Sequence, residues 1–178
     1  TVAAWSAYSK IDGIFWMIMG AFGVAITTFV GQNHGAGKHD RVKKSVWVCL
    51  GMSAGTSVML SILLLCFGQY VFLLFTDDAV VLEIGMKVLR FLAPMFITFV
   101  SIEIFSGALR GMGKSFIPLL LTCFGVCVFR IVWITVMVPI KRDLFTLIFS
   151  YPLTWSTTSI LFLIYYLVTI RKMKPALK

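Results

Sequence analysis

The sequence contains few of the residues that bind metals or form disulfides, with four cysteines and two histidines among 178 residues. The cysteines all fall within long apolar runs, at Cys49, Cys66, Cys123 and Cys127, and none is placed for the disulfide framework of a secreted protein. Cys123 and Cys127 lie one helical turn apart, but no histidine or further cysteine completes a set of metal ligands beside them. We therefore expect no metal site, and we interpret the cysteines as small apolar packing residues.

The chain also lacks the patterns of a nucleotide-binding or catalytic site. The glycine-rich segment GQNHGAGK at 31–38 falls short of a phosphate loop, because that motif needs glycine in place of Gln32 and serine or threonine in place of His39. A phosphate loop also follows a strand, whereas a long apolar run precedes this segment. His34 and His39 have no further metal ligands beside them, and no nucleophile–base pair lies within the apolar runs. We therefore expect neither an enzyme nor a bound cofactor.

Apolar residues, by contrast, are abundant. They make up 60% of the chain, and the mean hydropathy is +0.97, whereas a soluble domain averages roughly 45–50% apolar residues. One small core cannot bury so much apolar surface, so the composition predicts an all-α integral membrane protein. The alternative, a set of core helices in a large soluble protein, is disfavoured because the apolar runs are too long and too close together.

Five apolar runs each reach the roughly 20 residues that cross about 30 Å of hydrocarbon. We expect Pro94 to kink the third helix near its outer end, after a short amphipathic piece that contains Glu83, Lys87 and Arg90. We also expect the chain to be the C-terminal part of a longer polypeptide, because it has an odd number of spans and no initiator methionine. The five transmembrane helices are predicted at approximately 2–30, 45–67, 91–109, 117–139 and 145–170.

The net charge of +9 indicates the orientation in the membrane when the 16 lysines and arginines are placed relative to the predicted spans. If the five helices alternate in direction, ten of these residues lie on one side of the membrane, five lie on the other, and Arg130 falls inside a span. The positive-inside rule then places the larger group, with the C-terminus, in the cytoplasm. These charges are expected to contact membrane lipid headgroups rather than nucleic acid.

Two acidic residues inside the predicted spans are candidates for function, because an Asp at a helix centre costs about 3 kcal/mol and usually faces a cavity or a partner. Glu103 is the thirteenth residue of the 91–109 run. Such a carboxylate could take up and release a proton or capture a cationic solute. The alternative is a structural ion pair with Arg110, two turns away on the same face, or with Arg130.

The second acid, Asp12, lies three or four residues inside the outer boundary of the first span, with Tyr8 and Trp16 one turn away on either side. An acid between aromatic rings can bind an organic cation through charge and cation–π attraction. The alternative is an interfacial acid with neighbours in an aromatic belt. Asp12 belongs to a stripe of small, polar or aromatic residues whose 3, 4, 4, 3, 4 spacing marks one helix face, turned toward other helices or a cavity. The stripe comprises Ser9, Asp12, Trp16, Gly20, Gly23 and Thr27.

Arg130 lies near the middle of the fourth span, in GVCVFRIVW. One interpretation is a counter-ion for Glu103 or for an acid elsewhere in a longer polypeptide. The other is a structural clamp that donates to backbone carbonyls of a neighbouring helix.

Two turn motifs resemble those of the multidrug and toxic compound extrusion (MATE) family. VGQNHGAGKHDRVKK, at 30–44, resembles the turn after the second helix of each lobe, and SGALRGMGKSFIPLLL, at 106–121, resembles an LRG-x-G turn with a following proline. The likeness continues through FRIVW to the end and covers nearly the whole chain. It implies two six-helix lobes, of which this chain would supply helices eight to twelve, most of the C-terminal lobe.

The resemblance also implies export of organic, often cationic, compounds by alternating access, in exchange for protons or sodium ions. Acids in the eighth and tenth helices are functional in parts of this family, and Asp12 and Glu103 are their nearest counterparts here. The expected partners are organic cations, membrane lipids and the missing N-terminal part of the polypeptide. The expected location is the plasma membrane of a prokaryote, the inner membrane where there are two.

Two other functions stay open. A flippase for lipid-linked oligosaccharides, from the same superfamily, would need a basic cavity for pyrophosphate, whereas only Arg130 lies deep in the predicted spans and two acids oppose that charge. A non-transporting membrane scaffold predicts that both acids tolerate neutral replacement.

Overall fold

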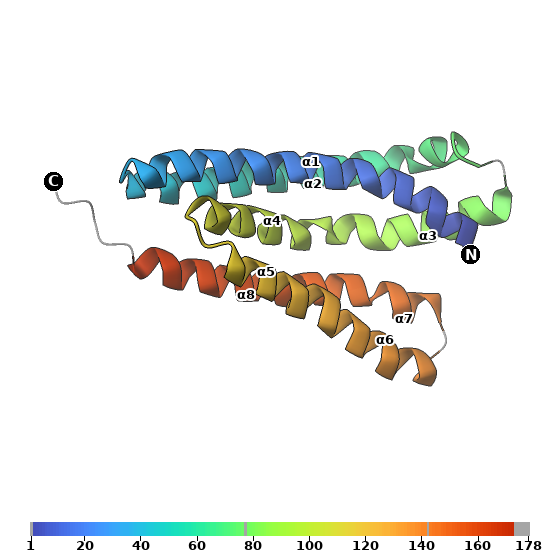
Figure 1. Cartoon of the computed structure of the whole chain (residues 1–178). Coiled ribbons are helices and arrows are strands. Elements are labelled where there is room, and N and C mark those ends of the chain that lie inside the picture. The colour runs from blue at the N-terminus through green and yellow to red at the C-terminus, as the bar shows by residue number, and fades with distance from the viewer. Residues whose placement is uncertain (1, 77, 142, 173–178) are drawn as a thin grey trace.

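The computed structural model describes residues 2–76, 78–141 and 143–172, which form an all-helical bundle (Figure 1). Two of its long helices contain short turns of a different winding, a 3-10 turn after α3 and a π turn after α5. The elements in chain order are α1 (Val2–Gly35), α2 (His39–Leu73), α3 (Ala79–Leu92), the 3-10 turn (Ala93–Met95), α4 (Phe96–Gly111), α5 (Phe116–Thr122), the π turn (Cys123–Val128), α6 (Phe129–Ile140), α7 (Leu144–Ile148) and α8 (Ser150–Lys172).

Five helices, counted through these turns, are long and apolar enough to cross a membrane, as the sequence predicted. The third begins at Ala79 rather than near 91, because the expected amphipathic piece continues directly into the span. The 3-10 turn contains Pro94, whose backbone nitrogen carries no hydrogen and cannot donate a helical hydrogen bond. The five helices cover Ala4–Gly35, His39–Leu73, Ala79–Gly111, Phe116–Ile140 and Phe145–Lys172.

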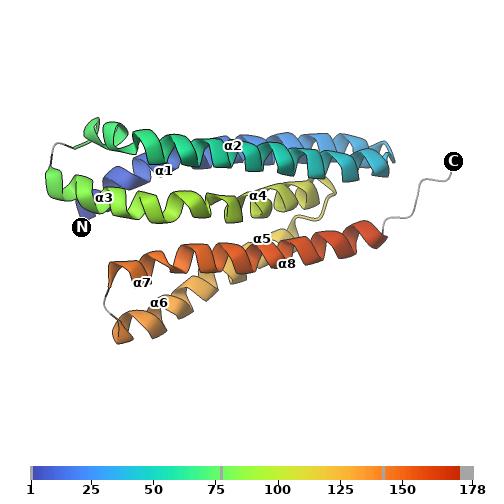
Figure 2. The same cartoon turned by 180° about the vertical axis from the view of Figure 1, so that it is seen from behind.

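The helices stack in three layers, with α1 and α2 in the first, α3 and α4 in the second, and α8 with α5 and α6 in the third (Figures 1 and 2). The α1–α2 turn, the α4–α5 turn and the end of α8 lie together at one end of the bundle. The most basic segments of the sequence fall at these positions, so the positive charges gather at one end of the bundle. That this end faces the cytoplasm stays a prediction.

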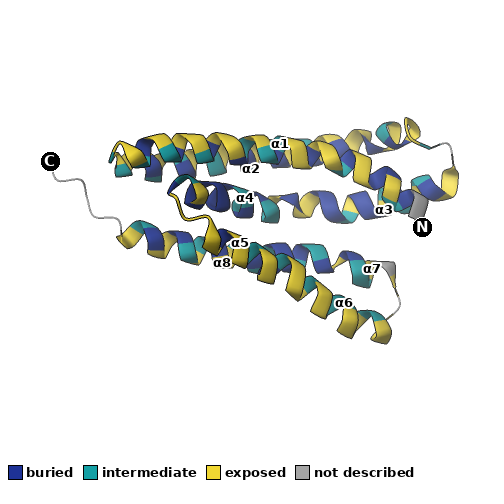
Figure 3. Ribbon diagram, viewed as in Figure 1, coloured by how far each residue is buried: buried dark blue, intermediate teal, exposed yellow. Residues whose placement is uncertain are grey.

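The outer surface of the bundle is mostly apolar, and the buried residues line the inner faces of the helices (Figure 3). The α3–α4 helix is central, and aromatic pairs join it to both outer layers. Phe96 stacks on Phe15 of α1 with ring centroids 4.1 Å apart, and Phe105 stacks on Tyr166 of α8 at 5.0 Å. In lipid an apolar exterior carries no penalty, so packing inside the bundle determines helix association.

The backbones of α1 and α4 approach closely where α4 presents two glycines one turn apart. An added Cβ at Gly107 would lie 2.8 Å from the carbonyl oxygen of Gly23, and one at Gly111 would lie 2.5 Å from that of Thr27. The Thr27 hydroxyl also donates to the Gly107 carbonyl oxygen at 3.0 Å. Small residues at this spacing allow membrane helices to touch along their backbones.

The α5–α6 helix is the least enclosed part of the bundle. None of the residues described in α6 is buried, and in Figures 1 and 2 this helix diverges from α8 toward the connection to α7. Its closest backbone approach to α8 among the described glycines is at Gly125 in the π turn, where an added Cβ would meet the Thr158 side chain. The sequence analysis predicted the span at 117–139 but not the π turn within it.

Candidate functional site

A cavity of about 320 Å³ lies between α1, α4, α8 and the α5–α6 helix. Its volume is within the roughly 300–1,000 Å³ range of small-molecule sites. Its described wall combines one carboxylate, two guanidinium groups, two aliphatic hydroxyls and four aromatic side chains, one of them a phenol. The residues that line it are Trp16, Phe99, Ile102, Glu103, Ser106, Arg110, Thr122, Val126, Arg130, Tyr151 and Trp155.

Glu103 is held at the contact between α4 and α1. Its side chain occupies the space opposite Gly23, where an added Cβ would lie 2.9 Å from Glu103 Cδ. Gly23, which belongs to the stripe predicted on α1, therefore leaves space for the Glu103 side chain of α4. The Glu103 side chain is 23% exposed, and Glu103 is one of the residues that line the cavity.

The predicted pair between Glu103 and Arg110 is present. Arg110 Nη2 donates to Glu103 Oε1 at 3.2 Å, and the Arg110 side chain is 42% exposed. The two residues lie two turns apart on one face of α4, and both line the cavity. A half-exposed guanidinium is a weakly held partner, because exposed ion pairs are typically worth about 0–1 kcal/mol. The carboxylate can therefore exchange this partner for another cation.

Arg130 lines the opposite wall, and its described contacts are with side chains of α8 rather than with Glu103. Its guanidinium donates to Thr154 Oγ1 at 3.2 Å and lies 4.0 Å from the centre of the Tyr151 ring. In the described part of the chain it pairs with no carboxylate, and its Nε has no hydrogen-bond partner. Arg130 is thus a cation of the cavity wall, supported from α8 by a hydroxyl and an aromatic face.

A continuous group of aromatic rings completes the wall. Trp16 lies 4.3 Å from Phe99 between ring centroids, and Phe99 lies 5.8 Å from Trp155, which in turn lies 5.6 Å from Tyr151. The sequence analysis did not identify Phe99, Tyr151 or Trp155 as site residues. A signal was available for each, since Phe99 is one turn before Glu103 and Tyr151 is one turn before Trp155.

The predicted cluster around Asp12 forms, with hydrogen bonds in place of contacts to ring faces. Tyr8 Oη donates to Asp12 Oδ1 at 3.3 Å, and Trp16 Nε1 donates to Asp12 Oδ2 at 2.6 Å. Both carboxylate oxygens therefore have a partner on α1 itself. Asp12 is not among the described residues that line the cavity, whereas the Trp16 ring is. Asp12 thus fixes the orientation of the Trp16 side chain, whereas Glu103 is the acidic residue among those described in the cavity wall.

The cavity wall contains side chains that could bind an ion. One carboxylate and a surrounding of aromatic rings suit an organic cation. Among residues 2–76, 78–141 and 143–172, no group of three or more His, Cys, Asp or Glu side chains could hold a metal ion. Glu103, Asp12, Trp16 and Tyr8 stay candidate site residues, and Arg110 and Arg130 stay candidate counter-ions.

Comparison with known proteins gives one family. The family model described as MatE matches residues 1–136. Multidrug and toxin extrusion protein 2 of Oryctolagus cuniculus is 30% identical over 135 residues, which cover 74% of this chain and 21% of that protein. The protein of the same name from Mus musculus is 29% identical over 119 residues, 65% of this chain and 20% of that protein. Probable multidrug resistance protein YoeA of Bacillus subtilis (strain 168) is 23% identical over 124 residues, 70% of this chain and 27% of that protein.

Two solved structures share the fold. An outward-facing multidrug resistance MATE family transporter superposes with a TM-score of 0.88 at 16% identity, covering 97% of this chain and 39% of that one. An inward-facing structure of such a transporter gives a TM-score of 0.85 at 14% identity, covering 98% of this chain and 41% of that one. The chain therefore spans less than half the length of the structures it matches, and about a fifth to a quarter of the curated relatives.

Proposed function

Because the chain belongs to the MATE family and is a multi-pass membrane protein, we propose that it is most of the C-terminal lobe of an antiporter for organic cations. Protons or sodium ions moving down their gradient would drive the export, and the lobe would alternate with its partner between inward- and outward-open states. The basic end of the bundle would face the cytoplasm. Such a protein is a transporter rather than an enzyme.

The observation that carries this proposal is a carboxylate in an aromatic cavity with an exchangeable partner. Glu103 lines the cavity beside Trp16 and Phe99, and its ion-pair partner Arg110 is half-exposed. A driving ion and an organic cation that compete for one carboxylate cannot occupy it together. This competition couples the two fluxes, because each release of one cation makes the site available to the other.

The test is gradient-driven transport by the full-length transporter that carries this chain. The protein is reconstituted in liposomes, and movement of a fluorescent organic cation is followed after a pH or a sodium gradient is imposed. We expect accumulation against the concentration gradient with one of the two, and its loss when an ionophore removes that gradient. Equal distribution of the dye under both gradients would reject antiport and favour the membrane scaffold.

Arg110→Gln is expected to raise the apparent affinity for the organic cation about two- to fivefold, because it removes a tethered cation that competes for Glu103 at a cost of up to about 1 kcal/mol. The measurement is the half-saturation concentration for transport in the same liposomes. Arg90→Gln is the matched control, since Arg90 is an exposed arginine of α3 outside the cavity. A lower affinity in Arg110→Gln than in Arg90→Gln would show that Arg110 helps to bind the substrate.

That opposite result would support a second candidate, transport of an anionic compound such as a lipid-linked oligosaccharide. One observation favours it: Arg110 lines the cavity together with Arg130, whereas the sequence analysis expected only Arg130 to be available. Two guanidinium groups can bind a phosphate group. The single carboxylate between α1 and α4 opposes it, and we rank organic-cation export first.

A further inference from the structure

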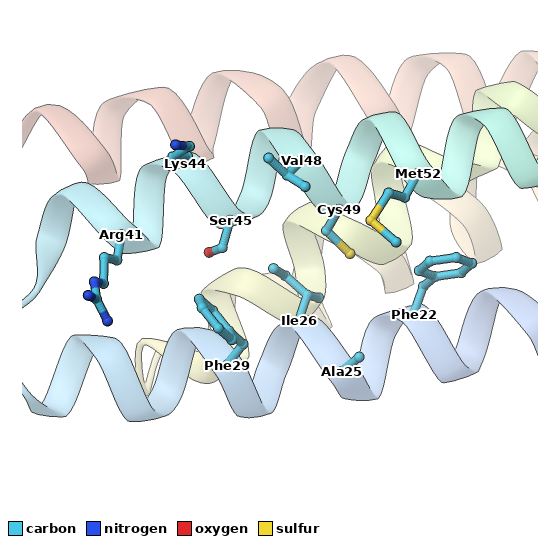
Figure 4. A pocket seen from close by; sticks show the side chains of 10 residues that line it. All are labelled: Phe22, Ala25, Ile26, Phe29, Arg41, Lys44, Ser45, Val48, Cys49 and Met52. Carbon is cyan, nitrogen blue, oxygen red and sulfur yellow. The ribbon is translucent and has the colours of Figure 1, made fainter.

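A second cavity, of about 530 Å³, is a groove between α1 and α2 near the turn that joins them (Figure 4). Its α1 wall is apolar and consists of Phe22, Ala25, Ile26 and Phe29. These residues recur at helical spacing and form one stripe along α1. The groove does not share any described lining residue with the cavity that holds Glu103.

The α2 wall changes character along its length. Val48, Cys49 and Met52 are apolar, whereas Arg41 and Lys44 stand in the first two turns of α2, nearest the basic end of the bundle. In Figure 4 the Arg41 side chain extends from α2 toward α1 at that end of the groove. The groove is therefore apolar along most of its length and cationic at its mouth.

The length of the groove fits one membrane leaflet. Arg41 and Met52 are 11 positions apart in α2, which corresponds to roughly 16 Å along a helix axis. This is about half of the roughly 30 Å hydrocarbon thickness. A molecule with its charge at Arg41 would place an apolar chain along the groove to about the middle of the bilayer.

Arg41 and Lys44, at the mouth of the groove, indicate which kind of molecule could occupy it. Within the described part of the chain, neither Arg41 nor Lys44 forms an ion pair. An apolar helix packed into the groove would bury both charges without compensation, which is strongly unfavourable. A phospholipid with a net negative headgroup would neutralise them at the surface and fill the rest of the groove with an acyl chain.

We propose that the α1–α2 groove is a binding site for an anionic phospholipid, with its headgroup on Arg41 and Lys44 and an acyl chain between Phe29 and Met52. The proposal is independent of what the Glu103 cavity transports. Because α1 contributes to both cavities, a lipid in the groove would contact the helix that supports Glu103 from its other side.

The test is photo-crosslinking in lipid nanodiscs that contain the full-length transporter and a phosphatidylglycerol with a diazirine in its acyl chain. Adducts are mapped by mass spectrometry of the peptides that cover 22–29 and 41–52. We expect labelling of both peptides, and a decrease of roughly 25-fold in Arg41→Ala/Lys44→Ala, because each of the two cations near an anionic headgroup contributes on the order of a factor of five. Lys38→Ala/Lys43→Ala is the matched control, since it removes two charges from the same end of the bundle but none from the lining of the groove.

The same diazirine in phosphatidylcholine separates headgroup recognition from contact with bulk lipid. Equal labelling of the groove by both lipids, or equal loss in the two double variants, would overturn the proposal. Lipid adducts elsewhere on the bundle but none in the groove would also overturn it, and would indicate that another segment of the polypeptide covers this face.

Discussion

Cells that express the full-length transporter with Glu103→Gln are expected to accumulate a fluorescent organic cation to the level of cells without the transporter. Glutamine has nearly the shape of glutamate and can still accept the hydrogen bond from Arg110, so the packing opposite Gly23 is preserved. It carries no charge and releases no proton at any working pH. The variant thus removes the Glu103 carboxylate, for which the driving ion and the organic cation would compete. Because this competition couples the two fluxes, the loss of efflux should be complete.

The control for this result is Glu83→Gln. Glu83 pairs with Lys87 at 2.7 Å on the exposed face of α3, outside the cavity, and its replacement should leave dye exclusion unchanged at equal expression. Full exclusion in Glu103→Gln would make Glu103 a structural residue and shift the search for the coupling acid to Asp12 and to helices outside this chain.

Gly111→Val is expected to have the largest effect on folding. Its Cβ would lie 2.5 Å from the Thr27 carbonyl oxygen and 3.0 Å from Val30 Cβ, and a backbone carbonyl cannot move aside as a flexible side chain can. The added bulk would force α1 away from α4, at a cost near the upper end of the about 1–3 kcal/mol typical of overpacking. We expect little protein of the correct size after extraction in mild detergent, and a lowered midpoint of thermal unfolding for what remains.

The matched control is Gly51→Val on α2. Gly51 is exposed, and an added Cβ there would meet nothing within 4 Å, so the helix gains the same side chain without a clash. Normal behaviour of Gly111→Val in the same assay would contradict the close α1–α4 contact. Poor behaviour of both variants would indicate a general intolerance of valine for glycine.

What the sequence could predict was local to one helix. The five membrane-length helices follow from apolar runs, and the pair Glu103–Arg110 follows from a separation of seven residues, which is two turns. Likewise, the hydrogen bonds to Asp12 join residues four apart on α1. Such contacts depend on helix geometry alone, so the residue spacing is enough to predict them.

What the sequence could not predict depends on how α8 packs against the other helices. The contact of Arg130 with Thr154 spans 24 positions, and that of Phe99 with Trp155 spans 56. No periodicity encodes which helix faces of distant segments meet. The π turn is equally hidden, because its residues Cys123–Val128 read as an ordinary apolar helix, although such turns are frequent at functional sites.

The weak enclosure of α6 has a consequence for the range of molecules that the cavity can accept. One wall of the cavity is formed by α1 and α4, which are held together by close backbone contact. The opposite wall includes Thr122, Val126 and Arg130 of the α5–α6 helix, which has few buried residues. Displacing that helix by a small amount disturbs little buried surface, so its cost in free energy is low compared with separating α1 from α4. In the proposed transporter, ligands of different width would share one carboxylate and one aromatic wall, and broad substrate tolerance would arise from the compliance of a single helix.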